Sequence, residues 1–260
     1  MNVPALRPLS VGEILDGAFK VYRNQFGTML ATSMALYVPL ALIQLLGGWM
    51  TSSMATDAEA NAGGVLVASL LALLAMPVWL IGLFAMLGAL TYQASRAYMG
   101  QPVSAGDSIR HGFSRFWSLV GAMFLVGICT MLGAVAFLIG AIFVWIMMFG
   151  VVPAVVIEGR GAGDSLSRSY ELSKGAWGPI FLVMVVAALI AGLPGWAVQA
   201  VTMMGMEPGS MSAAIGAAVS TLLSAITYPF SIAATVILYY DRRVRAEALD
   251  VQLAANLAGA

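Results

Sequence analysis

The stretch FWSLVGAMFLVGICTMLGAVAFLIGAIFVWIMMFGVVPAVVI, residues 116–157, contains no charged side chain. As one straight helix it would be about 63 Å long, roughly twice the thickness of the hydrocarbon core of a bilayer. Such a segment has to turn back on itself. Gly133 and Gly140 allow a reversal with little connecting loop, so we predict a tight helical hairpin with its turn between them.

The rest of the chain has the same apolar character. Of its 260 residues, 61% are hydrophobic and 9% are charged, whereas soluble domains carry roughly 25% charged residues. Further uncharged stretches occupy residues 24–56, 60–95, 175–206 and 208–240. Each is long enough to cross a bilayer as a helix, which satisfies its backbone hydrogen bonds internally. Together with the hairpin, they predict an all-α, polytopic membrane protein with six transmembrane helices.

The charged residues predict the orientation of these helices. With six spans, all twelve basic residues fall on one side of the membrane, and the opposite loops hold only Asp57, Glu59 and Glu207. Basic residues are enriched on the cytoplasmic side of membrane proteins. We therefore expect both termini in the cytoplasm, because five spans would place the basic cluster at 242–245 outside.

The chain also contains an internal repeat. Three segments align without gaps: SVGEILDGAFKVY from Ser10, SAGDSIRHGFSRF from Ser104 and GAGDSLSRSYELS from Gly161. Each has Gly and an acidic residue at its third and fourth positions, and apolar residues recur on one helical face. Ser10 with Glu13 has the pattern of a capping box. Each segment is predicted to form a short amphipathic helix at the cytoplasmic interface.

The repeat defines the domain organisation. We expect a single membrane domain over residues 1–260, built from three copies of an interfacial helix plus a transmembrane hairpin. The copies cover about residues 10–95, 104–157 and 161–240, and residues 241–260 form a cytoplasmic tail.

Three stretches carry a family resemblance: LRPLSVGEILDGAFKVYRNQF (6–26), PAVVIEGRGAGDSLSRSYELSKG (153–175) and YYDRRVRAEALD (239–250). They resemble the membrane domain attached to some bacterial glycerophosphoryl diester phosphodiesterases. The resemblance spans nearly the whole chain and implies a location in the bacterial inner membrane. The chain lacks the soluble catalytic barrel of those enzymes, so the resemblance does not imply their activity. Its landmarks are Pro153, Glu158, Arg168, Ser169, Tyr240, Asp241 and Arg245.

Catalysis and metal binding are not predicted. One histidine, His111, and one cysteine, Cys129, cannot supply the nitrogen and sulfur ligands of a zinc or iron site. The GxGD sequence at 161–164 and Tyr240-Asp241 match motifs of intramembrane aspartyl proteases, but in reversed order and outside the spans. We expect a protein that is not an enzyme and holds no cofactor or metal. The zero net charge and lack of a basic tract argue against nucleic acid.

Two groups of functional residues are predicted on the cytoplasmic face. Contacts with anionic lipid, or with a cytosolic or membrane protein partner, are predicted for Lys20, Arg23, Arg110, Arg115, Arg168 and Lys174. Structural salt bridges are predicted among Glu158, Arg168, Asp241 and Arg245. The leading hypothesis is a non-enzymatic membrane scaffold or accessory protein. The alternative is a small permease for an apolar or amphipathic solute, because prolines within spans can open a cavity.

Overall fold

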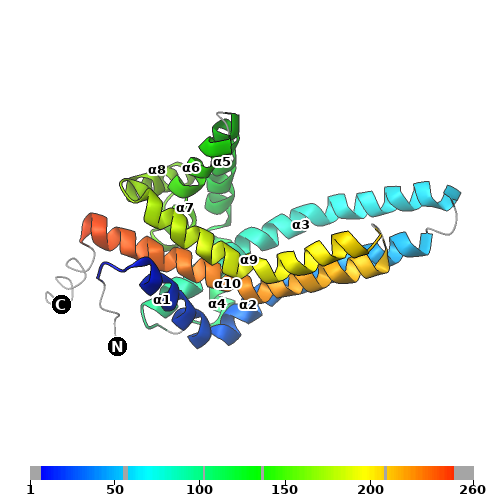
Figure 1. The fold of residues 1–260 in the computed structure, drawn as a ribbon, viewed down its shortest axis with the longest axis horizontal. Coiled ribbons are helices and arrows are strands. Elements are labelled where there is room, and N and C mark those ends of the chain that lie inside the picture. The colour runs from blue at the N-terminus through cyan, green and yellow to red at the C-terminus, as the bar shows by residue number, and fades with distance from the viewer. Residues whose placement is uncertain (1–6, 55–57, 102, 136–137, 208–209, 249–260) are drawn as a thin grey trace.

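The computed structural model describes residues 7–54, 58–101, 103–135, 138–207 and 210–248, whose regular elements are all helices (Figure 1). The prediction of an all-α protein is therefore confirmed. The helices are α1 (Val11–Asn24), α2 (Phe26–Met54), α3 (Ala58–Tyr98), α4 (Ala105–Ser114), α5 (Phe116–Val135), α6 (Leu138–Met147), α7 (Val151–Ile157), α8 (Ala162–Ser173), α9 (Trp177–Gly205) and α10 (Met211–Glu247).

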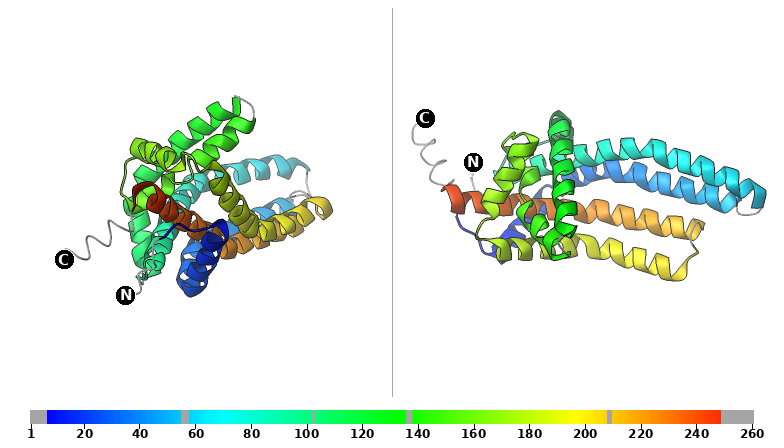
Figure 2. Two further views of the ribbon diagram at one scale, coloured as in Figure 1. Left: turned by 60° about the vertical axis from the view of Figure 1, so that its left-hand side comes forward. Right: turned by 90° about the horizontal axis from the view of Figure 1, so that it is seen from above.

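Four long helices, α2, α3, α9 and α10, run side by side as a bundle (Figures 1 and 2). α10 packs against the other three, and between Ile232 and Asp241 every residue except Thr235 is buried. Farther along the bundle, Gly48 of α2 faces Ala214 of α10 so closely that a Cβ at Gly48 would overlap the Ala214 Cβ. Small residues at such crossings are typical of helix packing in membranes.

The short helices α1, α4 and α8 gather at the end of the bundle where α10 ends, which we call the short-helix end (Figure 1). They begin after Ser10, Ser104 and Gly161, at equivalent positions of the three aligned segments. The capping box of α1 is present: the Ser10 N–H donates to Glu13 Oε2 at 2.8 Å, and the Glu13 N–H donates to Ser10 Oγ at 3.3 Å. The helices predicted from the alignment therefore form.

The stretch 116–157 forms the hairpin of α5 and α6, followed by α7. The connection between α5 and α6, at residues 136–137, lies outside the described residues. Gly133 and Gly140 pack against each other at the base of this turn, where a Cβ on either would overlap the other's carbonyl oxygen. Only glycine permits this close crossing of the two helices.

The second half of this stretch was expected to form one continuous helix as the fourth span. The structure instead divides it into α6 and α7. α6 ends at Met147 and α7 begins at Val151, with a break between them. Ser169 of α8 donates its hydroxyl to the Met147 carbonyl at 2.6 Å and accepts from the Gly150 N–H at 2.9 Å. A break in apolar surroundings is tolerated only where such partners satisfy the freed backbone groups.

Among the described residues, five segments are long and apolar enough to cross a membrane. They are Phe26–Ser52, Phe116–Val135, Gly140–Ile157, Trp177–Gly205 and Met211–Glu247. α3, the expected second span, is a helix but is not among the five, so the six-span architecture is not confirmed. In addition, the α5–α6 hairpin runs across the bundle rather than along it (Figures 1 and 2).

Large apolar side chains are exposed along these segments. Trp49 is 61% exposed, Trp196 58% and Phe124 68%. Monomeric soluble proteins rarely leave apolar surface of this extent in water. The surface is therefore suited to lipid, in agreement with the membrane assignment.

Candidate functional site

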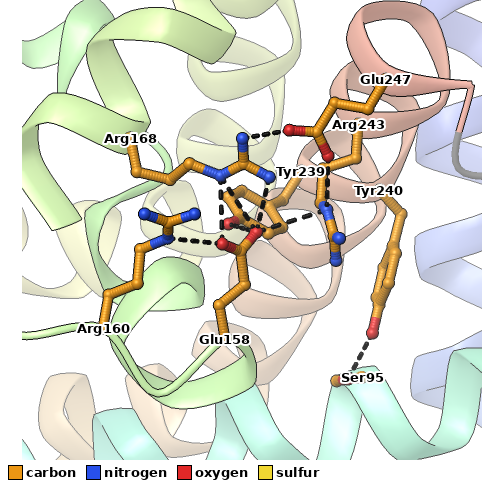
Figure 3. A network of polar contacts seen from close by, with 8 residues as sticks. All are labelled: Ser95, Glu158, Arg160, Arg168, Tyr239, Tyr240, Arg243 and Glu247. Carbon is orange, nitrogen blue, oxygen red and sulfur yellow. Dashed lines mark hydrogen bonds and ion pairs between the residues drawn. The ribbon is translucent and has the colours of Figure 1, made fainter. Parts of the chain in front are cut away.

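A charged network at the short-helix end is centred on Glu158, which follows α7 (Figure 3). Its carboxylate accepts hydrogen bonds from Arg168 Nη2 at 2.9 Å and from Arg160 Nε at 2.6 Å. The hydroxyl of Tyr239 in α10 donates to the same carboxylate. Arg243 Nε lies 3.3 Å from Glu158 Oε1. One acidic side chain thus joins the α7–α8 connection, α8 and α10.

A second carboxylate, Glu247, extends this network to the last turn of α10. Glu247 forms ion pairs with Arg168 and with Arg243, the latter at 3.3 Å. Arg168 therefore lies between two carboxylates, and its side chain is only 8% exposed. Among the described residues, two acids face three arginines in the network, which leaves these five side chains with one excess positive charge.

Local sequence explains how these residues converge. Tyr239, Arg243 and Glu247 are spaced four residues apart on α10, so their side chains lie on one face of that helix. Gly159 has φ +71°, a conformation that favours glycine, and it turns the chain sharply after Glu158. The α8 residues that precede Arg168 then start a new helix toward α10.

The network holds its charges at neutral pH. Burial by itself would raise the pKa of Glu158, but hydrogen bonds from Arg168, Tyr239 and Arg160 outweigh it and lower that pKa from 4.5 to about 2. The hydrogen bond to Glu247 raises the pKa of Arg168 against the opposing effect of burial, and the bonds to Glu158 add to it. The charged forms of Glu158 and Arg168 are thus stabilised by their partners.

A separate pair fastens the segment before α1 to α10. Arg245 Nε donates to Asp241 Oδ2 at 2.9 Å. The Leu9 N–H donates to Asp241 Oδ1 at 2.7 Å, and Arg245 Nη2 donates to the Leu9 carbonyl at 2.7 Å. A carboxylate and a guanidinium of α10 together satisfy both backbone groups of one residue.

The four residues predicted in salt bridges thus form two distinct pairs, Glu158–Arg168 and Asp241–Arg245. Sequence reasoning missed the other members of the network, which are Arg160, Tyr239, Arg243 and Glu247. The four-residue spacing on α10 was a readable signal for a common face. The residues that this face of α10 contacts, Glu158 and Arg168, could not be predicted, because they lie about 80 residues away along the chain.

The predicted lipid contacts divide by exposure. Lys20, Arg23, Arg110 and Lys174 are exposed, whereas Arg115 is half-buried. Lys20 pairs with Asp16 of its own helix at 2.6 Å. Arg168 is enclosed in the Glu158 network, so a lipid contact through its guanidinium does not fit this geometry.

An apolar cavity of about 390 Å³ lies where α5, α6 and α7 meet α3, α9 and α10. Pro153 and Tyr228 lie in its wall. Two of the threonines that line it donate their hydroxyls within their own helices, Thr91 to the Leu87 carbonyl and Thr235 to the Ser231 carbonyl. The cavity therefore offers mainly apolar contacts to an occupant.

Residues considered for chemistry have other contacts. The His111 Nε2 lies 3.2 Å from the Val156 carbonyl, and its ring stacks on Tyr92 with centroids 4.1 Å apart. Within the part of the chain that the structure describes, no group of three or more His, Cys, Asp or Glu side chains is placed to hold a metal ion.

No protein-family model matches the chain, and neither a curated protein nor a solved structure is significantly similar to it. The resemblance to the phosphodiesterase-associated membrane domain therefore rests on the three quoted stretches alone. The fold defines the class of the protein as an all-helical protein with five candidate membrane-spanning helices among its described residues.

Proposed function

We propose that the protein is a non-enzymatic membrane scaffold or accessory protein of the bacterial inner membrane, whose short-helix end faces the cytoplasm and contacts anionic lipid. In this proposal α2, α3, α5, α6 with α7, α9 and α10 are six spans arranged as three repeats. The observation that carries it is the position of four exposed basic residues on or next to α1, α4 and α8: Lys20, Arg23, Arg110 and Lys174.

Aromatic side chains support the same placement of the membrane surface. Phe26, Trp117 and Trp177 stand at the starts of α2, α5 and α9, directly after the three short helices, and are 41%, 81% and 41% exposed. Aromatic residues favour the headgroup level of a bilayer. The short helices would then lie at this level, with their basic residues next to lipid phosphates.

The charge at the opposite end supports the orientation. Glu207, which follows α9, is exposed there, and the described residues of that end include no Lys or Arg. Positive charge on one side only is the pattern of cytoplasmic loops. Each exposed basic residue near the surface can add about 1 kcal/mol of attraction to anionic lipid.

The test compares lipid retention in native mass spectrometry of protein purified in mixed micelles of phosphatidylglycerol and phosphatidylcholine. Replacing Lys20, Arg23, Arg110 and Lys174 by Gln should reduce the retained phosphatidylglycerol, and added salt should reduce it in the wild type. A matched control neutralises four exposed acids of the same helices and should increase retention: Asp16, Asp107, Asp164 and Glu171. Equal retention in all three proteins would contradict the proposal.

The apolar cavity favours a second candidate, a small permease for an apolar or amphipathic solute. A volume of about 390 Å³ accommodates a small organic molecule. The test is binding of the fluorescent probe 1-anilinonaphthalene to wild type and to Ala188→Trp, which places an indole in the cavity wall. Loss of saturable binding in the variant supports this function, and unchanged binding removes its basis.

A further inference from the structure

A second cavity, of about 330 Å³, lies at the short-helix end between α3, α4 and the α7–α8 connection. Its polar wall is formed by Ser95, Arg96, Gln101, His111, Arg115 and Tyr240. The Ser95 and Tyr240 hydroxyls are 2.8 Å apart and join α3 to α10 on one side of it (Figure 3). Hydrogen-bonding groups from four parts of the chain thus converge on one cavity.

The two arginines of this wall lack partners for their charges. Arg96 Nε is buried and has no hydrogen-bond partner among the described residues, although its guanidinium lies 5.8 Å from the centroid of the Tyr92 ring. The Arg115 guanidinium likewise makes no hydrogen bond or ion pair within the described ranges, and it packs against Gly159. A buried N–H without a partner is costly, so such groups usually mark a place for an acceptor.

The neighbouring carboxylate does not neutralise them. Glu158 is the one acidic residue in the described wall of the cavity. Its oxygens already accept from Arg168, Arg160 and Tyr239, and Arg243 lies 3.3 Å away. The charged network beside the cavity has an excess positive charge of its own, so the cavity combines two unpaired guanidinium groups with a positive surrounding.

From this geometry we infer that the cavity binds a phosphate group. Guanidinium groups suit phosphate because their planar N–H pairs match two oxygens at once. The phosphate comes either from a phospholipid headgroup or from a free phosphoester in solution. The inference uses residues other than the four exposed basic ones and does not rest on the proposed function.

The experiment measures ligand binding to the detergent-solubilised full chain by native mass spectrometry and by thermal shift. The lipid probe is phosphatidic acid, with diacylglycerol of the same acyl chains as the control that lacks only the phosphate. The soluble probe is inorganic phosphate, with chloride at equal ionic strength as its control. We expect saturable binding of phosphatidic acid or of inorganic phosphate. The matched control, diacylglycerol or chloride, should show no saturable binding.

Two variants test the assignment to this cavity. The double variant Arg96→Gln/Arg115→Gln should weaken phosphate binding at least about tenfold. The single variant Arg115→Gln removes no hydrogen bond within the described protein. It therefore keeps the test valid if the double variant fails to fold. Retention of phosphatidic acid alone assigns the site to lipid, and a response to inorganic phosphate assigns it to a free phosphoester. The inference would be overturned if Arg115→Gln bound each probe as tightly as the wild type does.

Discussion

Replacing Glu158 by Gln should destabilise the protein by about 3 kcal/mol. The Glu158 and Arg168 side chains are 11% and 8% exposed, and removing one partner of a buried ion pair costs about 3–5 kcal/mol. Glu247 still faces Arg168, and the amide oxygen of the substituted side chain can still accept one bond, so the lower end of that range applies. The lowering of the Glu158 pKa from 4.5 to about 2 gives a similar figure, about 3 kcal/mol.

The assay is unfolding by sodium dodecyl sulfate in dodecylmaltoside micelles, followed by circular dichroism. The matched control is Asp16→Asn, which removes the acid of an exposed ion pair with Lys20 whose side chains are 61% and 66% exposed. That variant should lose no more than about 0.5 kcal/mol. The double variant Glu158→Gln/Arg168→Gln should lose less than the sum of its single variants, because the two residues share one network. A loss for Glu158→Gln no larger than that of Asp16→Asn would refute the stabilising role of the network.

The remaining predictions concern pH, the helix break and the topology. Because the folded pKa of Glu158 is depressed, its stabilising contribution is complete above about pH 5 and is lost as pH falls toward 2, whereas Glu158→Gln should lack this part of the acid sensitivity in the same unfolding assay. Ser169→Ala leaves two backbone groups at the α6–α7 break without their side-chain partner and should cost about 2 kcal/mol, while Ser169→Thr should restore most of it if the hydroxyl is responsible. In a Cys129→Ala background, Glu207→Cys should react with a membrane-impermeant thiol reagent in intact cells, and Ala246→Cys should not. Both positions are exposed in the structure. Labelling of Ala246→Cys without labelling of Glu207→Cys would exclude the proposed orientation.

The topology test uses Ala246 because of what the structure shows at the other positions. Arg243 is engaged by Glu158 and Glu247, so protection of a cysteine there would reflect packing as well as membrane side. Asp57, in the loop between the first two expected spans, lies outside the described residues. Ala246 is on the same turn of α10 as the network but is exposed.

The starts of the short helices could be predicted because the information is local. Gly12, Gly106 and Gly163 are each the second residue of a helix, α1, α4 and α8. The side chains that set these starts stand within three residues of them, as with Ser10 and Glu13. Alignment of three segments with one another was therefore sufficient to place them.

The break after α6 could not be predicted because its stabilising partner is distant. Residues 148–150 resemble the apolar residues around them, and only the Ser169 hydroxyl, about 20 residues later, makes the interruption favourable. Arg168 was predicted both as a lipid contact and as a salt-bridge residue, and its position on the helix alone could not separate the two. On a helical wheel it belongs to a polar face, but the neighbours of that face are Glu158 and Glu247 rather than solvent.

The direction of the α5–α6 hairpin is the point at which sequence and structure differ most. α5 and α6 carry almost no polar side chains, and Met131, Leu132 and Val135 are 73%, 67% and 82% exposed. An interfacial helix needs a polar face, so a hairpin that lay flat at the headgroups would place apolar surface against water. The spanning bundle and a transverse hairpin cannot both cross the bilayer along its normal.

Two interruptions of the helices separate the hairpin from the charged network. Arg115 alone separates α4 from α5, and the break at 148–150 separates α6 from α7. α7, Glu158 and α8 are held to α10 by ion pairs and by the Tyr239 hydroxyl, whereas apolar contacts hold α5 against α3, α7 and α8, and aromatic contacts hold α6 against α9. In a bilayer, burial of the exposed apolar side chains at about 25 cal/mol per Å² favours rotation of the hairpin toward the bundle axis. The proposed six spans require this rotation, which breaks apolar contacts of α5 and α6 but no ion pair of the charged network.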